Sequence, residues 1–351
     1  MSSKSLGKAR LAGLGVARRK AVSVSSSSLV DFEPLDPGTE LPLLVRPAGP
    51  GVDLAGWAAS SREAINQHLS KHGAILFRGF GLSTAEDFHA AVQALSGDLL
   101  EYKERSSPRS AVHGKTYTST DYPPDQPIFL HNENSYQQTW PMKIFFFCRV
   151  PAAKGGETPI ADVRKIYLRI HPEIRQRLMK KKWSYVRNFG DGFGLSWQTV
   201  FQTDDKANVE AYCGQNGIVC EWKDGNRLRT RAVRPVAVRH PESDCMVWFN
   251  HATFFHVSTL TEPIREALLQ EFSEEDLPAN SYYGDGTPIE AEVLDHLRSL
   301  YEAETVRFPW QRGDLLMLDN MKVAHGRAPF EGSREILVGM ADPCSWDRFE
   351  A

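Results

Sequence analysis

Three residues of this chain are able to bind one metal ion together: His131, Glu133 and His325. His131 and Glu133 are separated by one residue at the end of an apolar stretch. Alternate side chains of an extended strand point to the same side, so both can reach one ion. Two histidines and one carboxylate hold one face of Fe(II) and leave the opposite positions open for a cosubstrate and O₂. The pattern predicts a non-haem iron site with these three residues as its catalytic ligands.

The sequence around His325 favours the same prediction. Residues 313–320 have the pattern of a turn followed by a buried strand, which would deliver His325 from a second strand. Arg334 comes nine residues after His325 and begins another apolar run. A guanidinium group binds a carboxylate through two parallel hydrogen bonds. A dicarboxylic cosubstrate such as 2-oxoglutarate would need such a partner.

Several segments, taken together, resemble the taurine dioxygenase (TauD/TfdA) and clavaminate-synthase-like family of Fe(II)/2-oxoglutarate dioxygenases. They are Arg-Arg-Lys-Ala-Val-Ser at 18–23, Gly-Gly-Glu-Thr at 155–158, Tyr-Val-Arg-Asn-Phe at 185–189, Trp-Phe-Asn-His at 248–251 and His-Gly-Arg at 325–327. The resemblance covers residues 30–345. It is nearest to the syringomycin-pathway type of amino-acid β-hydroxylase found in nonribosomal-peptide pathways. It implies that Fe(II), 2-oxoglutarate and O₂ take part in the reaction, and that Thr158 and Arg334 bind the distal carboxylate of 2-oxoglutarate.

Two positions narrow the expected chemistry within that family. The taurine enzyme has a second arginine four residues after the cosubstrate arginine, where it binds the sulfonate, and this chain has Val338 there. An alkyl-sulfonate substrate is therefore not expected. Related halogenases replace the metal-binding carboxylate with a small residue so that chloride can bind iron. Because Glu133 is a carboxylate, the resemblance implies hydroxylation.

Further residues are candidates for substrate binding. Arg327, beside the metal histidine, either binds a substrate carboxylate or braces its own loop. Asn250 and His251 are candidates for the pocket wall. Thr158 has the alternative of being an ordinary β-branched strand residue.

Three functions remain open at this stage. The first is hydroxylation of an unactivated C–H, at Cβ of an amino acid with aspartate as the first guess, free or tethered to a carrier protein, in antibiotic or secondary-metabolite biosynthesis. The second keeps the metal centre but produces desaturation, cyclisation or epoxidation of a small molecule. The third is a non-catalytic jelly-roll binding module, which the complete set of metal-binding residue types disfavours.

Composition excludes several classes of protein. A net charge of −3 and 41% hydrophobic residues are typical of a globular protein, with no basic stripe for nucleic acid. The apolar stretches are too short to cross a membrane. Five cysteines without regular spacing predict reduced thiols and a cytoplasmic location. Residues 1–30 are basic and serine-rich. They are expected to form a mobile tail able to attract an acyl or peptidyl carrier protein, with a cleaved transit peptide as the alternative.

The remaining pattern predicts elements that would position the site. Many short strands with helices inserted between them predict a mainly β fold whose core is a double-stranded β-helix, or jelly roll, in a single domain over 31–351. Helices are expected over 52–72, from a capping box at 83–86 to Gly97, from Asp162 to 182 with a break at Pro172, from 261, and over 287–304. Strands are expected over 73–79, 128–136, 143–150 and 313–320. Residues 101–127 are expected to form a polar, proline-rich loop of the kind that covers a site.

Overall fold

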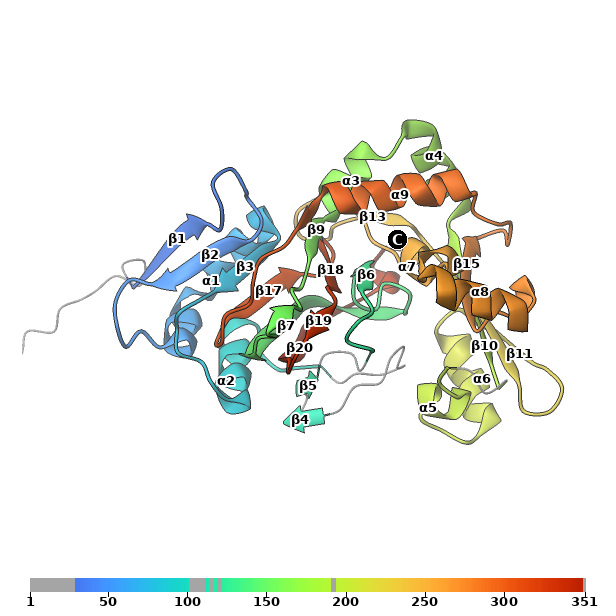
Figure 1. Ribbon diagram of the computed structural model, residues 1–351, viewed down its shortest axis with the longest axis horizontal. Coiled ribbons are helices and arrows are strands. Elements are labelled where there is room, and N and C mark those ends of the chain that lie inside the picture. The colour runs from blue at the N-terminus through green and yellow to red at the C-terminus, as the bar shows by residue number, and fades with distance from the viewer. Residues whose placement is uncertain (1–28, 101–110, 114–115, 119–121, 191–193, 350–351) are drawn as a thin grey trace, which may run out of the picture.

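Two sheets facing each other form the centre of the molecule (Figure 1). The computed structural model describes residues 29–100, 111–113, 116–118, 122–190 and 194–349. One hydrophobic cluster lies between the sheets and draws its side chains from both, including Phe146 and Leu316 on one side and Ile160 and Val323 on the other. The metal-binding residues predicted from the sequence lie on or beside the smaller of these two sheets.

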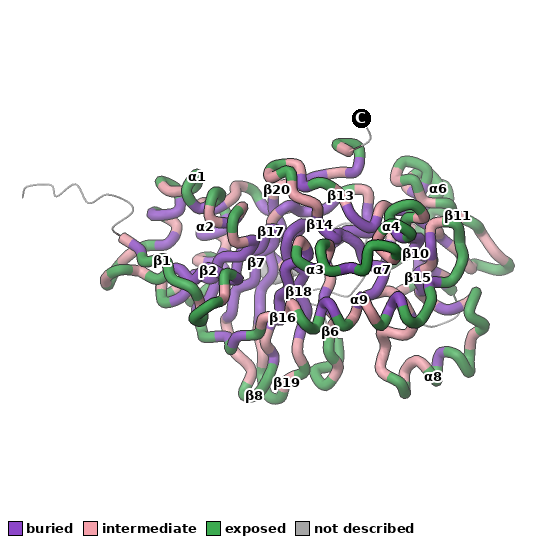
Figure 2. The backbone as a smooth tube through the Cα atoms, turned by 90° about the horizontal axis from the view of Figure 1, so that it is seen from above, coloured by how far each residue is buried: buried purple, intermediate pink, exposed green. Residues whose placement is uncertain are grey.

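The larger sheet has eight strands, antiparallel except for the β2–β3 pair. Its central strands are almost wholly buried (Figure 2), which explains their near-continuous apolar sequences. In spatial order the strands are β1 (Val30–Pro34), β2 (Leu43–Pro47), β3 (Ala74–Phe77), β17 (Leu315–Asp319), β7 (Thr139–Val150), β20 (Glu335–Ser345), β5 (Thr116–Thr118) and β4 (Ala111–His113).

The smaller sheet joins the two segments that carry the predicted metal ligands. In spatial order its strands are β16 (Thr305–Val306), β9 (Ile160–Asp162), β18 (Val323–Arg327) and β6 (Ile128–His131). In the antiparallel β18–β6 pair, His325 lies directly opposite His131. This register brings together two histidines that are far apart in the sequence.

Helices α1 (Leu54–His72) and α2 (Ala85–Leu95) cover the outer face of the large sheet. Both were expected from apolar spacing, but the capping box of α2 is shifted by one residue. Thr84 is the N-cap, its hydroxyl accepts from the amide of Asp87, and the Asp87 carboxylate accepts from the amide of Thr84. The prediction paired Ser83 with Glu86. Aspartate at this position satisfies the same two amides as glutamate would.

The other elements form a helical and sheet layer around the smaller sheet. A third sheet contains β11 (Ile218–Trp222), β12 (Leu228–Arg234), β10 (Trp183–Phe189) and β15 (Ala279–Tyr283). Two pairs complete the strands: β13 (Ala237–Arg239) with β14 (Met246–Trp248), and β8 (Lys154–Gly155) with β19 (Phe330–Glu331). The helices are α3 (Val163–Arg169), α4 (Pro172–Lys181), α5 (Trp197–Phe201), α6 (Lys206–Gln215), α7 (Ala252–Phe255), α8 (Glu262–Glu271) and α9 (Ala291–Ala303), with 3₁₀ turns at Val257–Thr259, Glu274–Asp276 and Trp346–Phe349.

Most predicted elements are present, with three differences. The strand expected over 128–136 ends at His131, because residues 132–137 form turns and Asn134 has a φ of 58°. Part of the loop expected over 101–127 is the β4–β5 pair at the edge of the large sheet. The last predicted helix begins at Ala291, a few residues after Pro288. The predicted basic tail over 1–30 lies almost entirely outside the described residues.

Two further observations concern the predicted class of protein. Within the described residues, no helix combines the length and the apolar sequence needed to span a bilayer. All five cysteines are free thiols, as their irregular spacing predicted.

Candidate metal centre

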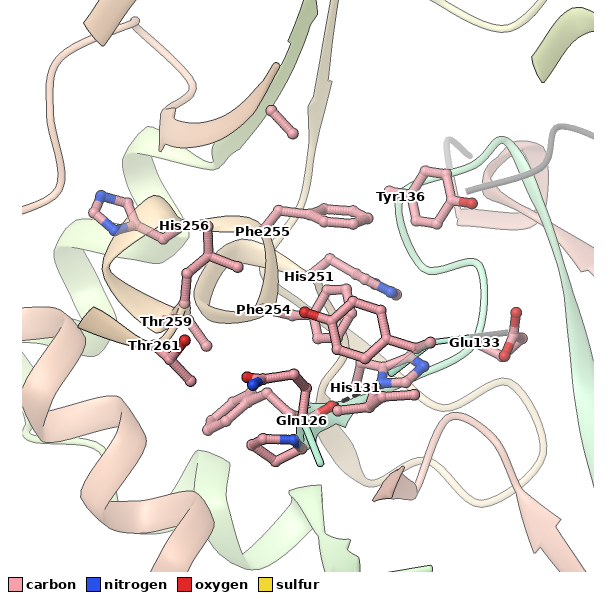
Figure 3. Close-up of a pocket in the computed structure, with 16 residues that line it drawn as sticks. Gln126, His131, Glu133, Tyr136, His251, Phe254, Phe255, His256, Thr259 and Thr261 are labelled. Carbon is pink, nitrogen blue, oxygen red and sulfur yellow. Dashed lines mark hydrogen bonds between the residues drawn. The ribbon is translucent and has the colours of Figure 1, made fainter. Parts of the chain in front are cut away.

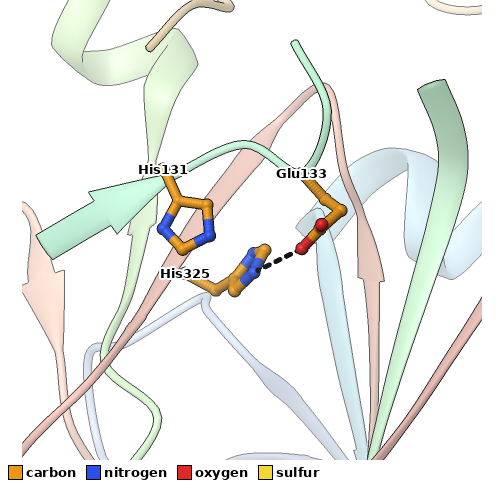
Figure 4. Close-up of side chains that lie close together, drawn as sticks. All are labelled: His131, Glu133 and His325. Atoms are coloured by element: carbon orange, nitrogen blue, oxygen red, sulfur yellow. Dashed lines mark ion pairs between the residues drawn. The ribbon is translucent and has the colours of Figure 1, made fainter. Parts of the chain in front are cut away.

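His131, Glu133 and His325 converge at one point of the smaller sheet (Figure 4). One potential ligand atom from each residue lies within 4.8 Å of those of the other two. Nε2 of His325 is 3.6 Å from a carboxylate oxygen of Glu133, and the two imidazole ring centres are 4.5 Å apart. Glu133 and His325 are buried and His131 is partly buried. Two imidazoles and a carboxylate in this arrangement match the ligand set of non-haem Fe(II) sites.

The ring of His131 is held in the form that suits a metal ligand. Its Nδ1 lies 2.9 Å from the main-chain carbonyl oxygen of Phe129 and donates to it. This hydrogen bond places the proton on Nδ1, so the lone pair is on Nε2. Histidine ligands in metalloproteins are commonly oriented in this way. The donor set of this chain therefore fits Fe(II).

Asn320 positions Glu133 and was missed by the sequence analysis. Its side-chain oxygen accepts from the Glu133 amide at 2.7 Å, and its Nδ2 donates to the carbonyls of Glu133 and Pro141 at 2.9 and 2.8 Å. Glu133 lies beyond the end of β6, so strand geometry does not fix it. The Asn320 side chain does so instead. An asparagine at the end of a predicted strand was the available signal, but nothing in the sequence pairs it with residue 133.

A small cavity of about 40 Å³ lies beside His131 and His325, and Thr158, Arg327 and Arg334 line it. Arg334 lies immediately before β20, and its Nε donates to the carbonyl of Gly156 at 2.8 Å. Burial lowers the pKa of Arg334 to about 10, and the nearby Arg327 adds to this effect, so the group remains a cation at neutral pH. The structure thus brings the predicted cosubstrate residues to one cavity next to the metal ligands.

Local packing explains why Arg334 reaches this cavity. Gly156 has a φ of +74°, and a Cβ at this position would lie 3.0 Å from Cδ of Arg334. The glycine therefore leaves room for the arginine side chain. The Thr158 hydroxyl accepts from Nε1 of Trp310 at 3.2 Å, which orients it at the cavity wall.

A second cavity, of about 260 Å³, is lined in part by His131 and Glu133 (Figure 3). Aromatic side chains form much of its wall, and the described residues that line it include neither lysine nor arginine. The full set is Tyr122, Gln126, Pro127, Ile128, Phe129, His131, Glu133, Tyr136, His251, Phe254, Phe255, His256, Thr259, Leu260, Thr261 and Ala279. Among the described lining residues, Glu133 is the one acidic side chain.

Two histidines of the large cavity are held uncharged. Burial, with the nearby His131 ring, lowers the pKa of His251 well below its ordinary value, and Nδ1 of His251 lies 2.6 Å from the Ser135 hydroxyl. Burial also lowers the pKa of His256 to about 4, and the Arg298 guanidinium acts in the same direction. At neutral pH both rings are therefore neutral hydrogen-bonding groups.

The structure separates the three substrate candidates. His251 lines the large cavity. The side chain of Asn250 instead donates to the carbonyl of Val236 and accepts from the amide of Ala252, so it stabilises the chain behind the wall. Arg327 donates to the main-chain carbonyls of the 122–127 segment. Of the two alternatives for Arg327, these contacts favour bracing.

Comparison with known proteins gives a consistent set of relatives. The model of the taurine catabolism dioxygenase TauD, TfdA family matches residues 31–341. The dapdiamide synthesis protein DdaC of Enterobacter agglomerans is 45% identical over 284 residues, which cover 81% of this chain and 86% of that protein. A clavaminate synthase-like protein of Arabidopsis thaliana is 33% identical over 291 residues, covering 80% and 85%.

The fold is also similar to solved structures at low sequence identity. PvcB from Pseudomonas aeruginosa matches with a TM-score of 0.54 and 16% identity, over 91% of this chain and 93% of that chain. A second structure of PvcB, an Fe, alpha-ketoglutarate dependent oxygenase from an isonitrile synthetic pathway, matches with a TM-score of 0.52. At this identity the likeness concerns the fold alone.

Proposed function

Because the chain belongs to the TauD, TfdA family and is a dioxygenase that uses Fe(II), 2-oxoglutarate and O₂, we propose that it hydroxylates Cβ of an amino-acid unit in the biosynthesis of a peptide-like secondary metabolite. Aspartate is the first candidate for that unit. The observation that carries the proposal is the metal-ligand group between two unlike cavities. The 45% identity to a dapdiamide synthesis protein supports the biosynthetic context.

In this proposal His131, Glu133 and His325 hold Fe(II), and Thr158 and Arg334 bind the distal carboxylate of 2-oxoglutarate in the small cavity. The two facing sheets that carry these residues would form the double-stranded β-helix expected from the family. A cytoplasmic location, which suits free thiols and a ferrous site, is part of the same proposal.

When bound, Fe(II) would activate O₂, which is the oxidant: one oxygen atom would enter the substrate C–H bond, and the other would convert 2-oxoglutarate to succinate with loss of CO₂. The protein's own contribution is geometry and exclusion of water. The aromatic side chains Tyr136, Phe254 and Phe255 would hold the substrate carbon over the metal and keep the site dry. His251, whose ring is neutral, is placed to hydrogen-bond a polar atom of the substrate.

The described wall of the large cavity, which includes no lysine or arginine, supports a substrate whose carboxyl group is masked. Burying an isolated carboxylate without a paired cation is strongly unfavourable. A free amino acid would bring its α-carboxylate, whereas a thioester on a carrier protein has none. We therefore propose that the tethered form is the better substrate. The side-chain carboxylate of aspartate meets the same difficulty, so asparagine, its neutral counterpart, is the substrate to compare with it.

The test is an assay with Fe(II), 2-oxoglutarate and four substrates: free aspartate, carrier-loaded aspartate, carrier-loaded asparagine and taurine. Product mass is measured for each. We expect a mass gain of one oxygen on a loaded carrier, a much slower reaction of free aspartate, and none of taurine, whose sulfonate has no second arginine because Val338 stands in that place. Equal rates on free and loaded aspartate would contradict tethering. Efficient oxidation of taurine would contradict the whole proposal.

A further inference from the structure

Arg327 contacts the walls of both cavities. It is the last residue of β18 and lines the small cavity together with Arg334. From there its guanidinium reaches the segment 122–127. Nη1 donates to the carbonyl of Tyr122 at 2.9 Å, and Nη2 donates to those of Pro123 and Gln126 at 2.5 and 2.7 Å. One side chain therefore supplies three hydrogen bonds to a single short segment.

This segment is part of the wall of the large cavity, to which it contributes Tyr122, Gln126 and Pro127. It has one more anchor from the same side of the molecule, because the amide of Phe330 donates to the carbonyl of Pro124 at 2.9 Å. The Phe330 ring in turn lies 5.3 Å from the guanidinium carbon of Arg327 and 5.6 Å from that of Arg334. The anchors of the segment and the cosubstrate arginine thus share one ring.

An irregularity in the β18–β6 pair directs Arg327 toward the segment. His325 pairs with His131, but Arg327 pairs with Ile128, so the register shifts between them. Gly326 lies at this point, where a Cβ would be 2.6 Å from the carbonyl oxygen of Ile128. Such bulges change the direction of the next side chain and are common beside active sites. The close approach permits only glycine here.

The charges of Arg327 and Arg334 link the hydrogen bonds of Arg327 to the binding of a carboxylate in the small cavity. Arg327 and Arg334 are like charges on one cavity wall, and the charge of Arg327 is felt by Arg334. A carboxylate placed between them would offset their repulsion. Its binding would therefore stabilise Arg327 in the position from which it holds the 122–127 carbonyls.

We propose that Arg327 is a positioning residue that couples binding of the dicarboxylate in the small cavity to ordering of the 122–127 wall of the substrate cavity. The proposal rests on the placement of 2-oxoglutarate against Arg334. By reciprocity, an ordered wall also strengthens binding of the dicarboxylate. Substrate would then meet a complete cavity only when the cosubstrate is in place.

The experiment measures hydrogen exchange of peptides covering residues 122–131 in the full-length Fe(II) protein without oxygen, with and without 2-oxoglutarate. We expect 2-oxoglutarate to slow exchange there about fivefold or more, the lower end of typical couplings between sites. The Arg327→Gln variant should still bind 2-oxoglutarate, but the cosubstrate should no longer slow exchange in these peptides. Arg327→Lys keeps the charge, but a single ammonium nitrogen does not span three carbonyls, so a smaller slowing than in the wild type is expected. The matched control is Arg149→Gln, which removes a half-buried arginine that pairs with Glu335 on the neighbouring strand, and it should show the same slowing of exchange as the wild type.

The proposal is overturned if 2-oxoglutarate slows exchange equally in Arg327→Gln and in the wild type. It is also overturned if 2-oxoglutarate does not slow exchange in the wild type. If Arg327→Gln does not fold, Arg327→Lys decides: a slowing equal to that of the wild type overturns the coupling. Failure of the underlying placement has a different signature. In that case Arg334→Ala would leave the dissociation constant of 2-oxoglutarate unchanged.

Discussion

The small and large cavities share His131 but differ in the charge that they offer to a ligand. The small cavity has two guanidinium groups on its wall, from Arg327 and Arg334. The large cavity has mainly aromatic side chains, with no lysine or arginine among its described residues. Under the assignment proposed above, the cosubstrate would be recognised by its charge and the substrate by its shape and neutral hydrogen-bonding groups. The same difference in charge would direct the cosubstrate and the substrate to different cavities beside one metal centre.

The largest loss of activity is expected from substitution of the metal-binding residues. His131→Ala or His325→Ala leaves two protein ligands, too few to hold Fe(II) against exchange, so succinate formation from 2-oxoglutarate should disappear. Glu133→Ala is expected to retain some binding of Fe(II) and 2-oxoglutarate while hydroxylation collapses. Succinate release is measured with the metal content of each variant. Full turnover in either histidine variant would remove the metal assignment.

A change at Arg334 in the small cavity is expected to act directly on binding of the cosubstrate. Arg334→Ala removes one partner of a desolvated ion pair, which typically costs about 2–5 kcal/mol. The dissociation constant of 2-oxoglutarate should rise by about one to three orders of magnitude. Arg149→Ala, at a half-buried arginine that pairs with Glu335, should leave the dissociation constant unchanged. An unchanged affinity in Arg334→Ala would move the cosubstrate contact to another cation, with Arg327 next in place.

A change at Asn320, which supports the metal ligand Glu133, should lower the affinity of the protein for Fe(II). Asn320→Ala removes the side chain that fixes both main-chain groups of Glu133. Loss of such supporting contacts typically costs about 10–100-fold in metal affinity. We therefore expect that loss in an oxygen-free Fe(II) titration, together with a lower melting temperature from the unsatisfied buried groups. Unaltered metal affinity would show that Glu133 is positioned by other contacts.

The smallest effect is expected from a single hydrogen bond in the large cavity. Ser135→Ala leaves the His251 ring without its 2.6 Å partner. An intramolecular hydrogen bond contributes about 0.5–1.5 kcal/mol, so the KM for the loaded carrier should rise about two- to tenfold. The KM for 2-oxoglutarate should stay constant, since neither Ser135 nor His251 lines the small cavity. A matching rise in both constants would contradict the separation of the two cavities.

The grouping of His131, Glu133 and His325 was predictable from the sequence, because a metal site depends on residue type and, for the first two, on short spacing. His131 and Glu133, with one residue between them, lie close together in the structure. They do so although the strand ends at His131 and Glu133 occupies a turn. Arg334 was also placed correctly at the head of a buried strand. These features depend on residues that are close in the sequence, so sequence patterns are sufficient to predict them.

Features that depend on tertiary approach were not predictable in the same way. The contact of Asn320 with Glu133 joins residues 187 positions apart. The contact of Arg327 with Tyr122 joins residues 205 apart. Sequence alone left Arg327 with two possible roles, because a guanidinium can donate to main-chain carbonyls as well as to a carboxylate. Only the position of segment 122–127 favours one of them.

The most direct test of the central claim uses ¹⁸O₂ with carrier-loaded aspartate and asparagine, Fe(II) and 2-oxoglutarate, followed by mass spectrometry of the released amino acid and of succinate. A 2-oxoglutarate-dependent hydroxylase places one atom of O₂ in succinate and the other in the product. We predict a β-hydroxylated amino acid that carries one ¹⁸O, formed together with labelled succinate. Labelled succinate with a product that has lost two hydrogens, or with no amino-acid product at all, would contradict hydroxylation of a tethered amino-acid unit.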